Sequence, residues 1–262
     1  LCLEVLETSN LQNILQNNPP DMKQVRRYHK LMEKYFSQGG LPGVCFIRES
    51  KLREQKIEEQ LRTILDRDLR LVQKILLPFS DIRNLVDVLA QTQSHPLDYT
   101  LLKKETGIST PTIKKIIYAL EAVFVIRIVP IEGSTMGSTI LFEDQGEASY
   151  LRRSAVDLKA QLSHFIFTNI RQQFFYRIGE SVRVFQYRTR GGAFVPICFA
   201  NKSGVLGLLP LNEISDLDSL SGTVNSFLSH YENGKIILVH NQEEPPKLFK
   251  PRVLLAPVGY IL

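Results

Sequence analysis

Five basic residues are the side chains of this sequence best suited to contact a polyanion. Arg188 and Arg190 precede a pair of glycines, so one loop would present both guanidinium groups. Guanidinium and ammonium groups bind phosphate oxygens without reading the base sequence. Lys202 follows in the same basic stretch, and Lys114 and Lys115 lie earlier, on an expected helix. We expect these five residues to contact nucleic acid.

The charge balance differs between two parts of the chain. Residues 150–202 carry nine basic side chains, opposed by Asp157 and Glu180 alone, whereas residues 81–132 carry six basic and six acidic side chains. Attraction to a polyanion depends on such a local excess of positive charge. The later part is therefore the more basic surface, and its side chains would either bind phosphates, form a solvated face or pair with acids of another domain.

The spacing of cysteine and histidine argues against a disulfide framework and against a zinc site. Cys2, Cys45 and Cys198 are odd in number and far apart, and the five histidines show no paired spacing. We expect reduced thiols, no bound metal and no cofactor in this chain.

The composition is that of a globular protein that does not cross a membrane. The 262 residues are 44% hydrophobic and 23% charged, with a formal net charge of +5. No stretch approaches the roughly 20 apolar residues that span a bilayer, and the first residues do not form a signal peptide. We therefore expect a cytoplasmic protein, and the lack of an initiator methionine fits a piece of a longer chain.

Residues 1–80 are expected to form a helical linker. Residues 22–36 place apolar side chains at helical spacing before the glycines and proline of residues 39–43 interrupt the pattern. A long helix is expected over residues 49–76, with Leu61, Leu65 and Leu76 on its apolar face.

Residues 81–143 show the pattern of a winged helix-turn-helix. Gly107 is placed to end the second of three expected helices, and Ser109 is placed to cap the third. Two strands, residues 123–129 and 139–142, follow across a glycine-rich tip. In a DNA-binding protein the third helix would lie in the major groove. The side chains then expected near phosphates are Ser109, Thr110, Thr112, Lys114 and Lys115.

Residues 144–262 are expected to form a small domain with the element order αβββαβ. The expected helices cover residues 155–176 and 217–231, and the expected strands cover residues 182–187, 193–200, 205–209 and 236–240. An extended tail is expected after Pro245-Pro246. The whole chain is therefore predicted to be an α+β protein in three parts.

Several short motifs of the chain occur in a known order. They are Gly39-Gly40-Leu41-Pro42, Leu65-Asp66-Arg67-Asp68-Leu69, the helix-turn-helix run 101–120 and Leu141-Phe142-Glu143-Asp144. In order and spacing they resemble the region after the nucleotide-binding core of bacterial and archaeal AAA-type ATPases that carry a winged helix and a restriction-endonuclease-like terminal domain. The resemblance covers nearly the whole chain. It implies a parent ATPase whose own core binds ATP and Mg²⁺ and is a partner of this region.

The catalytic motifs that the resemblance would supply are missing from the sequence. A P-loop requires Ser or Thr after its Gly-Lys pair, but Ile236 follows Gly234-Lys235. A nuclease requires metal-binding carboxylates on adjacent strands, yet no Asp or Glu lies between Glu180 and Glu213. We therefore expect no catalytic residue, and a degenerate endonuclease-like domain over residues 144–262.

Three hypotheses of function follow. In the first, the chain is a non-catalytic, regulatory and nucleic-acid-contacting C-terminal region of an AAA-type ATPase. In the second, it is a protein-interaction module that docks the ATPase core or another protein. In the third, it is a divergent metal-dependent nuclease that uses carboxylates from elsewhere, such as Asp144 or Glu213.

Overall fold

The computed structural model describes residues 1–8, 10–133, 137–152, 158–177 and 182–262. The chain forms two compact units. Unit 1 comprises Leu1–Glu33, Pro130–Met136 and Asp157–Leu262, and unit 2 comprises Lys34–Val129 and Gly137–Val156. Helices and a mixed sheet confirm the predicted α+β class.

The units group the chain differently from the predicted segments 1–80, 81–143 and 144–262. The first residues pack in unit 1 with the C-terminal part of the chain, where the Lys235 ammonium donates to the Leu6 carbonyl at 2.9 Å. The Tyr260 hydroxyl likewise donates to the Asn18 carbonyl at 2.6 Å. These contacts join residues more than 200 positions apart, so no local pattern could have predicted them.

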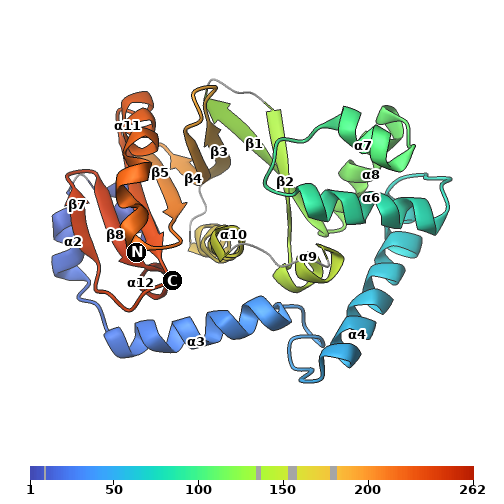
Figure 1. Cartoon of the computed structure of the whole chain (residues 1–262), viewed down its shortest axis with the longest axis horizontal. Helices are drawn as coiled ribbons and strands as arrows, with labels where there is room; N and C mark the ends of the chain where they lie inside the picture. Colours follow the sequence, from blue (N-terminus) through green and yellow to red (C-terminus); the bar gives the residue numbers. More distant parts are fainter. Residues whose placement is uncertain (9, 134–136, 153–157, 178–181) are drawn as a thin grey trace. The chain divides into compact units, whose positions relative to one another are not determined.

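Unit 1 is built on the strands of the C-terminal part (Figure 1). In unit 1 the strand order is β1-β3-β4-β5-β6-β8-β7, in which the last residues of β1 (Ile126–Gly133) pair with β3 in parallel. The pairs β3–β4, β4–β5 and β7–β8 are antiparallel, whereas β5–β6 and β6–β8 are parallel. The other strands of the unit are β3 (Arg183–Arg188), β4 (Phe194–Asn201), β5 (Gly204–Pro210), β6 (Gly234–His240), β7 (Lys247–Lys250) and β8 (Val253–Pro257).

Helices cover both faces of this part of the sheet. On one face α11 (Ser221–His230) buries Phe227 against residues such as Tyr187. On the other face α10 (Leu158–Arg177) stacks Phe174 on Phe199 at a ring separation of 4.7 Å. The remaining helices of the unit are α1 (Cys2–Glu7), α2 (Leu11–Asn17), the first part of α3 (Met22–Gln38), the 3-10 helix η2 (Ile214–Leu220) and α12 (Val258–Ile261).

The predicted order αβββαβ is present as α10, β3, β4, β5, α11 and β6, but the predicted tail is wrong. The chain after Pro246 forms β7 and β8 instead, and all five residues of β8 are buried. A short, continuous apolar run is typical of a strand buried on both faces, and this signal was present in the sequence. The predicted start of the helix at residue 155 lies outside the described residues.

Unit 2 is mainly helical. Its helices are α4 (Ser50–Thr63), the π-helix η1 (Ile64–Asp68), α5 (Leu69–Val72), α6 (Phe79–Thr92), α7 (Tyr99–Thr106), α8 (Thr110–Ala122) and α9 (Gln145–Arg152). The strand β2 (Gly137–Phe142) belongs to it, and β1 (Ile126–Gly133) is shared between the units. The helix α9 was not predicted.

The predicted long helix ends earlier than residue 76. The guanidinium of Arg70 donates to the carbonyls of Ile75 and Leu77 at 2.7 and 2.9 Å, which holds the following chain in a non-helical path. Leu76, predicted on the apolar face, is therefore 85% exposed. The buried face of the helix consists of Ile57, Leu61, Leu65 and Leu69.

The local signals around α7 and α8 are confirmed. Gly107 ends α7 with a left-handed φ of +70°, and Ser109 caps α8 by accepting from the Thr112 amide. The strand predicted from residue 123 begins at Ile126, because residues 123–125 close the end of α8. In Figure 1, α6, α7 and α8 lie side by side.

Candidate nucleic-acid interface

The helix α8 separates a buried stripe from an exposed face. Isoleucines and Leu120 pack into the core of unit 2, and burying each such side chain contributes about 1.5–3 kcal/mol. The opposite side carries Lys114, Lys115 and Tyr118, all exposed, and the Tyr118 ring is 62% exposed. This side of α8 therefore offers two ammonium groups and a phenol to solvent.

Lys114 has a defined position on this face. Its ammonium lies 5.1 Å from the centre of the Tyr99 ring at the start of α7, which is cation–π distance. Lys103 and Lys104, on α7, are also exposed. None of these four lysines forms an ion pair with another residue in the described part of the chain.

Three acidic residues near these helices are engaged inside unit 2, whereas Glu105 on α7 is exposed. The Asp87 carboxylate accepts from the Arg83 guanidinium at 3.1 Å, and the Glu121 carboxylate accepts from the Ile128 amide at 2.8 Å. The Asp98 carboxylate accepts from two amides at the start of α7. These contacts fix the positions of the carboxylates but do not remove their charges, so residues 81–132 keep a balance of six basic and six acidic side chains.

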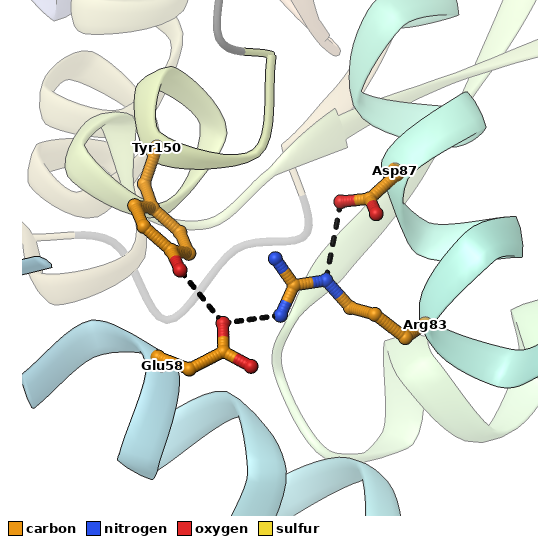
Figure 2. A network of polar contacts seen from close by, with 4 residues as sticks. All are labelled: Glu58, Arg83, Asp87 and Tyr150. Carbon is orange, nitrogen blue, oxygen red and sulfur yellow. Dashed lines mark hydrogen bonds and ion pairs between the residues drawn. The ribbon is translucent and has the colours of Figure 1, made fainter. Parts of the chain in front are cut away.

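A polar network holds α6 in place against its neighbours. Figure 2 shows the Arg83 guanidinium and the Tyr150 hydroxyl converging on one oxygen of Glu58, with Asp87 on the other side of the guanidinium. The Tyr150 hydroxyl donates to Glu58 Oε2 at 2.8 Å. These side chains come from α4, α6 and α9, so the network ties three helices together. Contact with the guanidinium and the hydroxyl outweighs partial burial and lowers the pKa of Glu58.

A second set of contacts fastens the Gly39–Gly40 turn to the start of α9. The Asp144 carboxylate accepts from the amides of Gly40 at 2.7 Å and Glu147 at 3.0 Å. Glu147 is itself buried, and burial, together with the charge of Asp144, raises its pKa to about 8. Two of the motifs read from the sequence, residues 39–42 and 141–144, thus meet in one structural contact.

In unit 1, Arg188 and Arg190 lie at the hairpin between β3 and β4. The Arg188 guanidinium lies 4.3 Å from the centre of the Phe194 ring, and its Nε has no hydrogen-bond acceptor among the described residues. Partial burial lowers its pKa. Arg190 is exposed in the turn, which Thr189 closes by accepting from the Ala193 amide at 3.1 Å.

Lys202 does not join this pair. It lies in the turn between β4 and β5, whereas Arg188 pairs with Phe194 at the opposite end of β4. The eight residues of β4 separate the two ends by about 23 Å at the usual rise per strand residue. The structure thus brings Lys114 and Lys115 together, and Arg188 and Arg190 together, but places Lys202 elsewhere in unit 1.

Tyr118 on α8, and Lys103 and Lys104 on α7, are all exposed, and none of the three was singled out from the sequence. Tyr118 follows Lys114 by four positions, so helical spacing alone places it on the side opposite the isoleucine stripe. That signal was available in the sequence.

The acids considered for a nuclease have structural contacts. Asp144 holds the Gly40 turn, and the Glu213 side chain caps η2. Within the described ranges, no group of three or more His, Cys, Asp or Glu side chains gathers in a way that could hold a metal ion. None of the described helices combines the length and apolar character needed to cross a membrane.

Comparison with known proteins gives one match. The model of a domain of unknown function (DUF8612) matches residues 29–143. This range covers most of unit 2, including the Gly39–Gly40 turn and α6, α7 and α8. No curated protein and no solved structure matches the chain.

Proposed function

We propose that this chain contacts nucleic acid through the exposed face of α8 and performs no catalysis. The observation that carries this proposal is the exposure of Lys114, Lys115 and Tyr118 on one side of a helix, where neither lysine forms an ion pair with another described residue. Ammonium groups are donors that contact phosphate oxygens. Binding would therefore depend more on the phosphate backbone of the nucleic acid than on its base sequence.

In this proposal α6, α7 and α8, with β1 and β2, act as a winged helix-turn-helix. Its support is the order of three helices before two strands and the caps Asp98 and Ser109, which fix the starts of α7 and α8. In such modules the last helix of the three meets the nucleic acid.

The hairpin of Arg188 and Arg190 is the second proposed contact. The Arg188 guanidinium rests on Phe194 with its Nε buried, so only its terminal NH2 groups could donate to a phosphate oxygen. Lys202 would contact a separate stretch of backbone, since it lies at the other end of β4.

We also propose, from the resemblance, that the chain is a regulatory region of a cytoplasmic AAA-type ATPase with a degenerate endonuclease-like domain. Support comes from strands β3, β4 and β5, whose residues include no Asp or Glu. ATP and Mg²⁺ would be bound by the ATPase core, which would be a partner of this chain.

The test of the α8 contact is the double variant Lys114→Gln/Lys115→Gln, compared with the wild type for DNA binding across a salt series. We expect weaker binding and a decrease of about 1–2 in the slope of log affinity against log salt. The matched control is Lys51→Gln/Lys74→Gln, which removes two equally exposed charges from other parts of unit 2. Equal binding by both double variants would contradict the assignment to α8.

Docking of a protein is the second candidate function, because Phe46, Leu71 and Leu76 in unit 2 are each more than 80% exposed. Where such side chains gather in one patch, they favour contact with another protein, such as the ATPase core. Co-purification with that core that is insensitive to salt, and that Leu71→Ser/Leu76→Ser abolishes, would support this candidate. Co-purification that the double variant leaves unchanged would contradict it.

A further inference from the structure

The C-terminal end of α8 has an unusual residue at its left-handed position. The Phe124 amide donates to the Glu121 carbonyl at 3.1 Å, and the Val125 amide donates to the Leu120 carbonyl at 3.0 Å. These two bonds form a Schellman motif, in which the residue at the left-handed position is usually glycine. Here that residue is phenylalanine, with a φ of +59°.

This placement is unfavourable for the fold in two ways. A side chain larger than that of glycine is strained at positive φ, because its Cβ approaches the following carbonyl oxygen. The Phe124 ring is also 71% exposed, so little burial offsets the strain. Glycine or asparagine would close α8 with less strain, and the ring therefore contributes little to the fold that holds it.

A second exposed aromatic side chain lies on α8 itself, six positions before Phe124. Tyr118 is 62% exposed and lies one turn after Lys114 and Lys115. The segment from Lys114 to Phe124 thus combines two ammonium groups with two exposed rings. Basic groups that follow a backbone and rings on which bases stack are the combination found in proteins that bind single strands.

The flat face of a ring finds a partner only where the face of a base is accessible. In a duplex both faces of each base are covered by neighbouring base pairs, whereas an unpaired base leaves its faces open. We infer that Phe124 and Tyr118 stack on unpaired bases, and that the α8 face binds single-stranded nucleic acid while Lys114 and Lys115 contact its phosphates. This inference rests on the proposed function and names its substrate class.

The test uses the full chain and two labelled probes, an oligothymidine and an abasic oligonucleotide of equal length. The abasic probe keeps the phosphates but has no base to stack. We expect the wild type to bind oligothymidine more tightly than the abasic probe. We expect Phe124→Gly and Tyr118→Ala each to weaken binding of oligothymidine by about 5- to 100-fold and to leave binding of the abasic probe unchanged.

Two further measurements exclude misfolding as the cause. Because glycine relieves the strain at this position, Phe124→Gly should have a Tm equal to that of the wild type or about 2–4 °C higher. Phe46→Ala, which removes another exposed ring of unit 2, should leave binding of both probes unchanged.

The outcomes separate this inference from the proposed function. Equal affinity of the wild type for both probes, or full retention of affinity in Phe124→Gly, would overturn the stacking inference. If Lys114→Gln/Lys115→Gln still bound both probes more weakly than the wild type, the proposed phosphate contact would stand without the stacking inference. Failure of the wild type to bind either probe or a duplex would overturn both.

Discussion

His240 lies on β6 with no exposed surface, and only one of its ring nitrogens is satisfied. Its Nδ1 accepts from the Gln242 amide at 3.2 Å, so the proton of the neutral ring is on Nε2, which has no partner among the described residues. Burial lowers the pKa of this ring below its usual 6.5, against the opposing charge of Glu244. The charge of Lys247 also lowers the pKa of His240.

Unit 1 should therefore become less stable as the pH falls below 6.5. The unfolded chain binds a proton at His240 at a higher pH than the folded chain does, so acid favours unfolding. In His240→Asn the shorter side chain can still accept from the Gln242 amide but does not titrate. Below pH 6.5, we expect the free energy of unfolding, measured by chemical denaturation, to decrease more in the wild type than in this variant. Parallel pH profiles of this free energy would contradict the role assigned to His240.

Glu147 shifts stability in the opposite direction with pH. Its pKa is raised from 4.5 to about 8, so the folded chain holds a proton that the unfolded chain releases. Stability of unit 2 should therefore decrease as the pH rises from 4.5 to about 8. Glu147→Gln keeps the shape of the neutral acid, and we expect it to be more stable than the wild type at pH 8 but not at pH 4.5. Hydrogen exchange of α9 at both pH values would measure this, and equal protection of the variant and the wild type at pH 8 would refute it.

At the scale of elements, the Gly39–Gly40 turn provides a matched pair of glycines. Gly39 has a φ of +73°, and a Cβ there would lie 2.6 Å from Asp144 Oδ1 and 2.8 Å from Gly146 Cα. Gly43 has a similar φ of +81°, but a Cβ there would meet nothing within 4 Å. The two positions differ in steric space and hardly in backbone strain.

Gly39→Ala should therefore destabilise unit 2 by about 2–4 kcal/mol, and Gly43→Ala by about 1–2 kcal/mol. The difference between these two losses of stability measures how much the packing of the turn against the start of α9 contributes. Urea denaturation of both variants measures it. A cost that is equal for the two substitutions would show that the turn does not need this close approach.

Elements with local signals were predictable from the sequence, and those that depend on distant contacts were not. Gly107 and Ser109 end and cap their helices through bonds to residues at most four positions away, so both were identified. The end of the long helix depends on Arg70 reaching carbonyls beyond it, and the predicted boundary at residue 76 was wrong. The strand β1 began later than predicted because the Schellman motif at Phe124 places a left-handed residue where β-forming side chains suggested a strand.

At the scale of the whole molecule, the sequence identified basic residues but could not group them. Arg188 and Lys202 are 14 positions apart, and only the pairing of β4 with β3 and β5 shows that they lie at opposite ends of a strand. The same limit applies to α1, whose packing in unit 1 involves residues near the other end of the chain. The surface of α8 was predictable in part, since helical spacing defines its exposed side.

The proposed binding of nucleic acid through phosphate contacts can be measured directly. The most direct measurement is the affinity of the full chain for a labelled DNA, single-stranded and duplex, across a salt series. We expect measurable binding at low salt, with log affinity decreasing linearly and steeply as log salt rises. No binding at low salt, or binding that does not change with salt, would contradict it and would favour docking of a protein.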